Sequence, residues 1–464
     1  MEFHEAANFL FELRRFPPRA GTDATRALLA ALDDPHEDPD CVQIAGSNGK
    51  GSTARMLERT LREAGLDVGL YTSPHLDDVR ERIRVNGRKL SEAALVEFVE
   101  TAKPYITDEG AVGASPTFFE TLTALAFWEF DRQDVDIAVL EVGIGGKYDA
   151  TSAVDPVASA VTSVTLEHTD ILGDTVEEIA TDKAHVAPAD RPLVTGTTGA
   201  ALAAVREQAG DVVTVGDSGD VTVDYGGRDG LEGAVTVAGP EWTVDTHLPL
   251  LGSHQAHNAG VAAALAWQLS DIVPADIAGA DIERGLRNAH WPGRFEVMGE
   301  SPLVVLDGAH NPGGLDRTMA TLEGFEYDAL HVVVGAMVDK DHAGIAAALS
   351  AADHAVACRP NVDRAEAPAV LADALRAETD ADVRARSDVA GAVGMALDDA
   401  GPDDAVLVTG SLYAVREART RWARPIVPKD VDSIPEAKAT LEAAHVTEPG
   451  AWRMRGKAVH RVLR

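Results

Sequence analysis

Short apolar runs alternate with longer stretches of helical period along the first part of the chain. Residues 41–45 form an unbroken run typical of a buried strand, and a helical pattern follows at residues 53–64 after a glycine-rich segment. Residues 68–71 supply the next strand, which completes a strand, glycine loop, helix and strand unit. The same alternation continues at residues 117–130, 137–140 and 157–164. Strands that alternate with helices predict a mostly parallel sheet covered on both faces.

The pattern changes between residues 212 and 247. Short strands of alternating polarity are split there by Gly and Asp, which predicts a small antiparallel sheet inserted in the first domain. From about residue 281 strands and helices alternate again, and the apolar runs of this second series lie at residues 304–306, 331–334, 354–357 and 405–409. The second series predicts a smaller α/β domain of Rossmann-like type.

These patterns divide the chain of 464 residues into three parts. We predict a first α/β domain over residues 1–290, a second one over residues 291–416, and a basic, proline-containing tail over residues 417–464. With 45% apolar and 25% charged residues, the composition is that of a globular chain. Two to four domains fit this length at roughly 100 to 200 residues each.

The charge is strongly negative. Acidic residues number 75 against 41 basic ones, which gives a formal charge of -34, and only nine of the basic residues are lysines. Such a field repels phosphate backbones and anionic headgroups, so we expect neither nucleic-acid nor membrane partners. The acid-rich, lysine-poor composition resembles that of proteins adapted to concentrated salt, as in a halophilic archaeon, because salt screens the repulsion between surface carboxylates.

The remaining composition favours a cytoplasmic protein. Cys41 and Cys358 are too few to staple so long a chain, and they lack metal-ligand spacing. The first residues contain acids and no signal-peptide pattern, and no run of 18 apolar residues occurs. We therefore expect a cytoplasmic monomer without a membrane span.

The glycine-rich segment has the composition of a phosphate-binding loop. Gly46 to Ser52 read GSNGKGS between a predicted buried strand and a predicted helix. Glycines let backbone N–H groups approach phosphate oxygens, the helix N-terminus adds positive potential, and Lys50 adds a charge. The spacing departs from the common G-x-x-x-x-G-K-[ST] pattern because Gly51 separates Lys50 from Ser52. A nucleotide site is favoured over an ordinary glycine turn.

Polar residues follow several predicted strands. Glu141 ends the run DIAVLE, where a carboxylate can hold Mg²⁺ directly or through water, although an acid in this position is commonly a solvated strand end. Ser73 and His168 each follow another strand. Alone, Ser73 would be read as part of a turn and His168 as a surface or core residue.

At GSNGKGS followed by YTSPHLDDVRERIRVNG, the sequence resembles the folylpolyglutamate synthase and dihydrofolate synthase family of the Mur ligase superfamily. The likeness continues in order over residues 20–416, and the further segments that carry it are TFFETLTALAFWEF, DIAVLEVGIGGKYDAT, VTSVTLEHTDILGDTVEEIATDKA, HQAHNAGVAAALA, WPGRFEV, VVLDGAHNP, GAMVDKD and VLVTGSLYAV. It implies that residues 1–290 are a P-loop ATPase domain and residues 291–416 a glutamate-ligase domain.

The resemblance implies roles at matching positions. The ATP-binding set is Asn48, Gly49, Lys50, Gly51, Ser52, Asn258, Arg294 and Asp307. The protein ligands of Mg²⁺ would be Ser73, Glu141 and His168, with K⁺ as a further cation. Lys183 matches a lysine that the family carbamylates, but its surroundings read TDKA where the family is closer to EKAGI, so an exposed helical lysine is the alternative. Lys50, Glu141, His168, Lys183 and His310 form the implied catalytic set.

The implied pterin site has two parts. Thr117, Phe118 and Phe119 would lie beside the flat ring, with core packing of the aromatic pair as the alternative. Tyr148, Asp149 and Ala150 form the second part, where Asp149 would accept hydrogen bonds from the pterin. Lys147 and Ser152 replace an arginine and an asparagine frequent in the family. His310 and Asn311 match a segment that lines the family's cleft, and the alternative for them is a helix-start turn.

The resemblance thus implies an ATP-dependent ligase that joins L-glutamate to a pterin or folate carboxylate through an acyl phosphate and releases ADP and phosphate. The acceptor would be dihydropteroate, a reduced folate or both. Two alternatives stay open. One is another Mur-superfamily amide ligase, and the other is an ATP-binding regulator without ligase activity.

Overall fold

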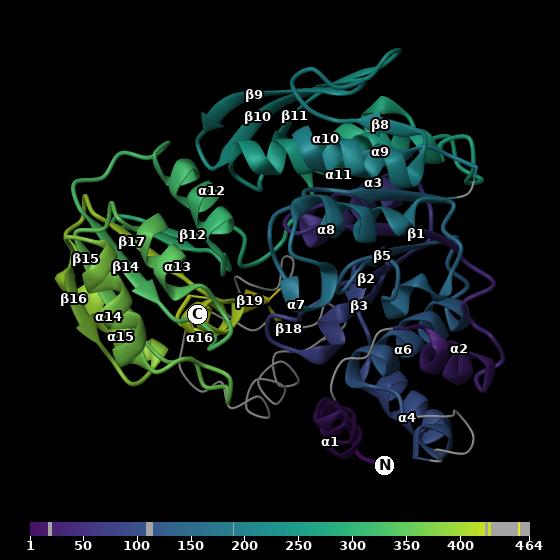
Figure 1. The fold of residues 1–464 in the computed structure, drawn as a ribbon, viewed down its shortest axis with the longest axis horizontal. Coiled ribbons are helices and arrows are strands. Elements are labelled where there is room, and N and C mark those ends of the chain that lie inside the picture. The colour runs from purple at the N-terminus through teal and green to yellow at the C-terminus, as the bar shows by residue number, and fades with distance from the viewer. Residues whose placement is uncertain (17–20, 108–114, 189, 423–425, 428–452, 455–464) are drawn as a thin grey trace. The chain divides into compact units, whose positions relative to one another are not determined.

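The computed structural model describes residues 1–16, 21–107, 115–188, 190–422, 426–427 and 453–454 (Figure 1). The chain forms two compact units. The first comprises Met1–Glu296 together with Asn311–Glu326, and the second comprises Val297–His310 and Tyr327–Arg464. Most of the predicted tail, residues 423–425, 428–452 and 455–464, lies outside the described residues. No described helix has both the length and the apolar character needed to cross a membrane.

An eight-stranded sheet forms the centre of the first unit, in the order β4-β3-β2-β5-β1-β6-β7-β8. Its strands are β1 (Asp40–Ala45), β2 (Val68–Tyr71), β3 (Ile83–Val85), β4 (Arg88–Lys89), β5 (Ile137–Glu141), β6 (Ala158–Val161), β7 (Leu193–Thr195) and β8 (Val212–Thr214). The pairs from β2 to β8 are parallel, and only β3 and β4 run antiparallel to their neighbours. The predicted mostly parallel sheet is therefore confirmed.

Alternating side chains place one core on each face of this sheet. Val42 and Ile44 of β1 point to one face, while Cys41 points to the other. The first face packs on α3 (Lys50–Glu63), α10 (Ser253–Leu269) and α11 (Gly279–Arg287). The opposite face packs on α1 (Phe3–Glu12), α2 (Asp23–Ala30), α4 (Glu92–Thr107) and α6 (Phe118–Arg132). Coverage of both faces explains why the strands are unbroken apolar runs.

The remaining helices of the first unit have 4 to 11 residues. They are α7 (Thr169–Leu172), α8 (Val176–Lys183), α9 (Gly199–Ala209) and α12 (Pro312–Leu322), with the 3₁₀ turns η1 (Leu13–Arg15), η2 (Val79–Arg82), η3 (Ala150–Ala153) and η4 (Ala184–Val186). Helices α8 and α9 close the sheet beside β7 through a separate apolar cluster that includes Ala180, Leu193 and Val205.

The inserted antiparallel sheet is present but starts later than predicted. It consists of β9 (Thr222–Asp229), β10 (Glu232–Ala238) and β11 (Thr243–Leu248). Residues 212–214 had the same alternating texture, yet they form β8, which pairs in parallel with β7. The two kinds of edge strand look alike in sequence because pairing direction depends on neighbours distant along the chain.

The second unit contains a six-stranded sheet in the order β12-β13-β17-β14-β15-β16. Its strands are β12 (Glu296–Glu300), β13 (Leu303–Leu306), β14 (Leu330–Val334), β15 (His354–Ala357), β16 (Asp382–Ala385) and β17 (Ala405–Thr409), and its helices are α13 (His342–Ala348), α14 (Pro368–Glu378), α15 (Val389–Asp399) and α16 (Leu412–Arg419). The pairs from β13 to β16 are parallel. The short strands β18 (Ile426–Val427) and β19 (Arg453–Met454) pair with each other. The predicted Rossmann-like character is confirmed.

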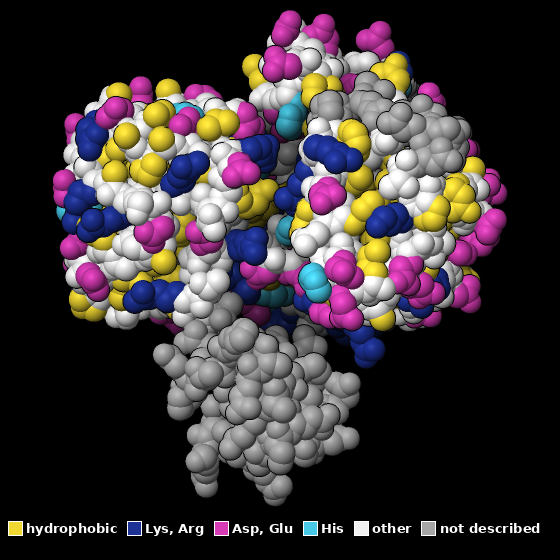
Figure 2. Space-filling model, turned by 90° about the horizontal axis from the view of Figure 1, so that it is seen from below, with side chains coloured by type: hydrophobic (Ala, Val, Ile, Leu, Met, Phe, Trp, Pro, Cys, Tyr) yellow, Lys and Arg dark blue, Asp and Glu magenta, His cyan; other side chains and the backbone are white. Residues whose placement is uncertain are grey.

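Asp and Glu side chains are spread over much of the face seen in Figure 2, with Lys and Arg among them. This distribution is consistent with the formal charge of -34.

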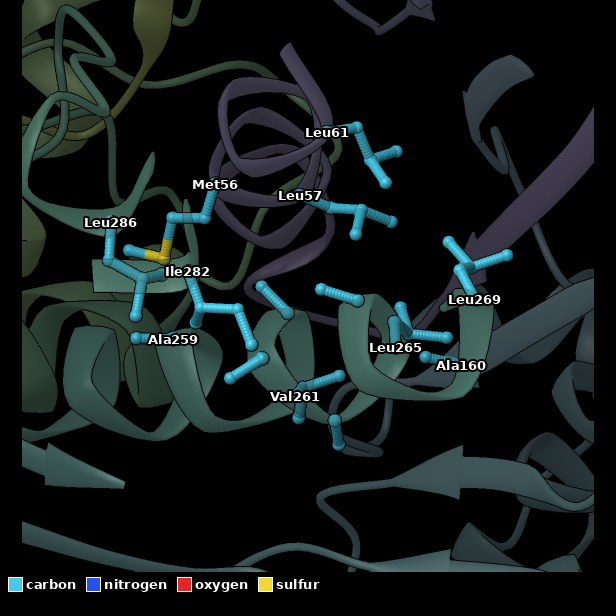
Figure 3. Packing of buried hydrophobic residues seen from close by; sticks show 14 of the residues in the cluster. Met56, Leu57, Leu61, Ala160, Ala259, Val261, Leu265, Leu269, Ile282 and Leu286 are labelled. Carbon is cyan, nitrogen blue, oxygen red and sulfur yellow. The ribbon is translucent and has the colours of Figure 1, made fainter. Parts of the chain in front are cut away.

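Helix α3 packs closely against α10 and α11 because small and large residues interlock (Figure 3). Leu57 and Leu61 of α3 face Leu265 of α10, while Met56 lies beside Ile282 and Leu286 of α11, all with no exposed surface. Gly285 of α11 lies directly on Thr60, whose backbone nitrogen would be 2.7 Å from a Cβ at Gly285. The backbones of α3 and α11 therefore approach each other closely at Gly285 and Thr60.

This contact predicts that Gly285→Ala destabilises the first unit. The added methyl group would collide with Thr60 backbone, so we expect a loss of about 1–3 kcal/mol in the free energy of unfolding. The measurement is urea unfolding in molar KCl.

Gly279→Ala in the same helix is the matched control. A Cβ there would meet only Val244 Cγ2 at 3.8 Å, an ordinary contact, so we expect a change within about 0.5 kcal/mol. Equal stability of the two variants would contradict the close packing of α11 on α3.

Candidate functional site

The phosphate loop follows β1 and leads into α3, with its glycines in conformations that other residues rarely adopt. Gly46 has φ +141° and Gly49, the N-cap of α3, has φ +94°. A Cβ at Gly46 would collide with Thr162 Oγ1, and one at Gly49 would collide with Asn258 Oδ1. The loop therefore depends on two glycines because Thr162, which follows β6, and Asn258 of α10 lie against it.

Hydrogen bonds to the segment after β6 hold the loop in place. The Ser47 N–H donates to the Ser163 carbonyl at 2.7 Å, and the Asn48 N–H donates to Ser163 Oγ at 3.1 Å. Thr162 Oγ1 donates to the Asn48 carbonyl at 2.8 Å. Nδ2 of Asn48 is buried and has no hydrogen-bond partner among the described residues. An orphaned buried donor in such a loop fits an acceptor supplied by a ligand, such as a phosphate oxygen.

Lys50 carries the positive charge of the loop. Its Nζ donates to the Gly46 carbonyl at 2.8 Å and to the Ser47 carbonyl at 3.3 Å, so the side chain folds back over the loop. Ser52 lies two residues further on and is buried in the first turn of α3. Lys50 and Ser52 thus both lie in the first turn of α3, directly after the glycine loop.

Glu141 ends β5 next to this loop and is 6% exposed. Its Oε2 accepts a hydrogen bond from the Ser73 N–H at 2.8 Å. A Cβ at Gly51 would lie 3.3 and 3.4 Å from the two carboxylate oxygens, so Gly51 leaves room for them. Burial raises the pKa of Glu141, against the opposing effect of Lys50, the Ser73 hydrogen bond and Arg294. A desolvated carboxylate of this kind is suited to bind a hard cation.

The predicted metal ligands are brought together only in part. Ser73 and Glu141 are in contact through the hydrogen bond from the Ser73 N–H. His168 lies on another element, as the N-cap of α7, with φ +48°. Within the described part of the chain, no three His, Cys, Asp or Glu side chains are grouped so that they could hold a metal ion. The chemistry of the donors suits Mg²⁺, but the protein side chains by themselves do not form a closed cage.

Lys183 is buried, so it is not the exposed helical lysine of the alternative reading. Its side chain is 2% exposed, and its Nζ donates to Glu167 Oε1 at 2.9 Å. Burial and the nearby charge of Lys50 lower the pKa of Lys183, and Glu167 opposes this shift. Although burial acts against the charged form of Glu167, Lys183 and Lys50 keep the pKa of Glu167 below its ordinary value.

Glu167 is a site residue that sequence reasoning missed. It precedes His168, and its carboxylate also interacts with Ser47 of the phosphate loop. Its place in the segment after β6, beside the predicted ligand His168, was the available signal. In the structure the Glu167 carboxylate interacts with Ser47 of the loop on one side and forms an ion pair with Lys183 on the other.

The first part of the predicted pterin site lies at the start of α6. Thr117 caps this helix, and Glu120 completes a capping box with it. Phe118 is buried, with the guanidinium carbons of Arg14 and Arg82 at 4.6 and 5.3 Å from its ring centre. Phe119 is partly buried against Tyr71. Phe118 therefore has the packing role of the alternative reading while also adjoining two cations.

The second part is a glycine turn held by Asp149. Oδ2 of Asp149 accepts from the N–H groups of Gly143 and Ile144, both at 3.0 Å. Oδ1 accepts from the Thr151 N–H and hydroxyl at 3.0 and 2.6 Å. Both carboxylate oxygens are thus engaged within the chain, whereas sequence reasoning expected them to face a pterin. Ala150 is buried, and Tyr148 is 50% exposed with Lys147 Nζ 4.9 Å from its ring centre.

The remaining predicted residues are distributed over both units. In the first unit, Asn258 donates from Nδ2 to Gln255 Oε1 at 3.0 Å, and Asn311 donates from Nδ2 to Asn48 Oδ1 at 3.4 Å. Arg294 donates from Nη1 to the Gly293 carbonyl at 3.2 Å.

Asp307 and His310 belong to the second unit. Asp307 Oδ1 accepts from the Ala309 N–H at 2.8 Å, and His310 Nδ1 lies 3.1 Å from the Gly308 carbonyl. Asn311 also caps α12, since its Oδ1 accepts from the Gly314 N–H at 2.7 Å. The helix-start reading of Asn311 is therefore right, and the residue contacts the phosphate loop as well.

Two family models match the chain. The Mur ligase middle domain matches residues 44–266, and the Mur ligase, glutamate ligase domain matches residues 293–412.

Similar proteins carry folate-enzyme names. The chain is 61% identical over its full length to a protein of Halobacterium salinarum named probable bifunctional folylpolyglutamate synthase/dihydropteroate synthase, and it spans 57% of that protein. A Haloferax volcanii protein of the same name is 56% identical, and the chain spans 56% of it. The folylpolyglutamate synthase of Lacticaseibacillus casei is 33% identical over 90% of this chain and 98% of its own length.

Solved structures of such enzymes share the fold. Mycobacterium tuberculosis folylpolyglutamate synthase complexed with ADP matches with a TM-score of 0.84 and 29% identity, over 91% of this chain and 98% of that one. Escherichia coli FolC in complex with DHPP and ADP matches with a TM-score of 0.79 and 30% identity, over 90% of this chain and 96% of that one.

The raised pKa of Glu141 predicts that Glu141→Gln stabilises the metal-free chain at neutral pH. The folded chain binds the Glu141 proton more tightly than the unfolded chain, so stability is lost as the pH rises through the folded-state pKa. Glutamine can still accept from the Ser73 N–H but never ionises. We expect the variant to be more stable than the wild type above this pKa, with the difference shrinking towards the unfolded value of 4.5.

The measurement is urea unfolding from acid to neutral pH in KCl with a chelator, since a bound cation would stabilise the carboxylate. Glu97→Gln, which changes an exposed side chain of α4, is the control and should leave the pH dependence unchanged. A Glu141→Gln variant that is less stable than the wild type at neutral pH would show that the carboxylate is not strained by burial.

Proposed function

Because the chain belongs to the folylpolyglutamate synthase and dihydrofolate synthase family of Mur ligases, we propose that it joins L-glutamate to the carboxylate of a pterin or folate with consumption of ATP. One observation carries the proposal beyond family membership. The phosphate loop with Lys50 lies beside a buried carboxylate, Glu141, which is bonded to Ser73. Such an arrangement would suit a phosphate chain and a cation.

The reaction requires activation of the acceptor carboxylate. An oxygen of this carboxylate attacks the γ-phosphorus, the bond to the β,γ-bridging oxygen breaks, and ADP leaves with that electron pair. The amine of glutamate then attacks the acyl carbon, phosphate leaves, and the amine nitrogen loses a proton. Loop N–H groups and Lys50 hold the phosphates in line, and the positive charge of Lys50 favours the charge that develops on them.

Mg²⁺ fits the buried Glu141 carboxylate, and the proposed protein ligands are Ser73, Glu141 and His168. When bound, the ion would neutralise phosphate charge. The residues of the chain have separate tasks. Lys50 would position phosphate oxygens and Asn48 would offer its unpaired Nδ2, while Asn258 lies against Gly49 and leaves no room for a side chain there.

The other proposed contacts follow the family pattern. Arg294 and Asp307 would contact the nucleotide, and His310 would adjoin glutamate and the transferred phosphate. Thr117, Phe118, Phe119, Tyr148 and Ala150 would adjoin the pterin, while Asp149 would shape its site through the glycine turn. Relatives of this chain are named folylpolyglutamate synthase or dihydrofolate synthase/folylpolyglutamate synthase. We propose dihydropteroate and reduced folates as the acceptors, in a cytoplasmic enzyme.

The first test is glutamate-dependent release of ADP in molar KCl with ATP and Mg²⁺, using dihydropteroate or tetrahydrofolate as acceptor. We expect a glutamylated product with at least one acceptor, and mass spectrometry of the product counts the glutamates added. Lys50→Ala should lower kcat by about 10²- to 10³-fold, since it removes one preorganised charge from the transferring phosphate.

Lys103→Ala is the charge-matched control, because Lys103 is exposed on α4 above Phe9 and distant in sequence from the loop. It should retain wild-type activity. Absence of glutamate-dependent ADP release with every acceptor would overturn the ligase proposal, and a fully active Lys50→Ala variant would overturn the role of the loop.

We further propose that Lys183 is carbamylated in the active enzyme. Its lowered pKa increases the fraction of neutral amine, which is the form that reacts with CO₂. Wild-type protein in ¹³C-bicarbonate should give a carbamate ¹³C NMR signal that Lys183→Arg lacks.

Lys147 is the control lysine, because its side chain is exposed and its hydrogen bond with Tyr148 raises its pKa. Lys147→Arg should therefore keep the signal. A wild-type spectrum without a carbamate signal would mean that Lys183 acts as an ammonium paired with Glu167.

A further inference from the structure

Two aromatic side chains stack where the chain leaves the first unit. Phe295 comes directly before Glu296, after which the chain passes to the second unit, and Phe325 comes directly before Glu326, after which it passes again. The two ring centres are 5.7 Å apart with an interplanar angle of 26°. The stack therefore brings two of the crossings between the units together at one place on the first unit.

The backbone of Phe295 depends on its surroundings. Its φ is +42°, a left-handed conformation that a residue with a bulky side chain rarely adopts. Such a conformation persists where neighbouring contacts hold it, and here the ring is buried against Phe325. The preceding residue is Arg294. Burial raises the pKa of Glu141, and the charge of Arg294 is among the effects that oppose this rise, so the segment held by the stack adjoins the site.

Arg228 of the inserted sheet lies over this aromatic pair. It belongs to β9, and its guanidinium carbon is 4.1 Å from the ring centre of Phe325, within the range of a cation–π contact. Its Nε donates to the Gly324 carbonyl at 3.0 Å, and its Nη1 donates to the Gly230 carbonyl at 2.7 Å. One bond thus holds the guanidinium to its own hairpin turn, and the other holds it to the residue beside Phe325.

The inserted sheet is itself fixed to the helix that carries Asn258. Val237 of β10 is buried in the apolar cluster that α10 shares with the large sheet. A Cβ at Gly260 of α10 would collide with Val223 Cγ2 of β9, so strand and helix are in close contact. Arg228 therefore extends from an element anchored on the first unit to the place where the chain leaves that unit.

We propose that Arg228, Phe295 and Phe325 form a clamp on the two crossings, and that Arg228 and Phe325 are positioning residues for the ligase reaction. The part that concerns activity rests on the proposed function. There, Arg294 of the first unit and Asp307 of the second would contact one nucleotide, so the reaction needs the units in a narrow range of arrangements. The clamp restrains the crossings, and the inserted sheet thereby limits how far the second unit moves relative to the first.

The first measurement is the distribution of distances between two fluorophores, one on each unit. Both native cysteines are buried, so the labels are attached to Lys103→Cys in α4 and Ala377→Cys in α14, which are exposed positions. Single-molecule energy transfer in molar KCl should show a broader distribution in Arg228→Ala and in Phe325→Leu than in the labelled parent. Distributions of equal width would overturn the clamp.

The second measurement is the steady-state kinetics of the whole chain. Arg228→Ala should lower kcat about two- to fivefold, on the scale of one exposed cation–π contact, and leave KM for ATP within about twofold. Phe325→Leu should lower kcat at least as much. Adding Arg228→Ala to it should change kcat by less than about twofold, because both changes remove the same contact. Unchanged kcat, additive effects or a change confined to KM would overturn the positioning role.

Arg206→Ala is the control, because it removes an exposed arginine from α9 of the same unit. It should match the wild type in both measurements, and urea unfolding should show that every variant is folded. A wild-type chain without ligase activity whose distance distribution still broadens with Arg228→Ala would overturn the proposed function and keep the clamp. An active wild type in which Arg228→Ala changes neither distance nor kcat would overturn the clamp alone.

Discussion

The site depends on the close approach of the phosphate loop to its neighbours. Gly46 lies against Thr162 and Gly49 against Asn258, so the loop can follow its path only without side chains at these positions. That approach fixes where α3 begins. Helix α3 in turn packs on α11, and their backbones come close together at Gly285. The position of Lys50 is therefore set by the sheet, α10 and α11 together. A phosphate site built on such rigid elements would be preorganised.

The electrostatics of this site oppose those of the whole molecule. The formal charge is -34, yet the phosphate loop carries Lys50, and Lys183 lies near enough for the charge of Lys50 to lower its pKa. Two carboxylates, Glu141 and Glu167, balance part of this charge, and the burial of Glu141 keeps it poorly solvated. Salt screens exposed surface charges more than buried ones, so concentrated salt would weaken the field of the surface carboxylates and preserve that of the buried groups.

Much of the architecture could be predicted from hydrophobic period. The strands of both sheets are short apolar runs, and the glycine loop between 41–45 and 53–64 is recognisable because its chemistry is local. Pairing direction was not local, which is why β8 was assigned to the wrong sheet. Glu167 and Asp149 show the same limit at the site. Their roles depend on Lys183 and on the Gly143 turn, partners that only the folded chain brings near.

Helix α12 gives the chain an unusual modular organisation. By sequence it follows β13 of the second unit, yet it is part of the first unit, where its cap contacts Asn48. The polypeptide consequently passes from one unit to the other at three places, after Glu296, His310 and Glu326. The units cannot be exchanged between proteins by a single crossover near residue 296 without also exchanging α12. Recombination among related ligases would therefore tend to inherit the phosphate loop and α12 as a matched pair, although 263 positions separate Asn48 from Asn311.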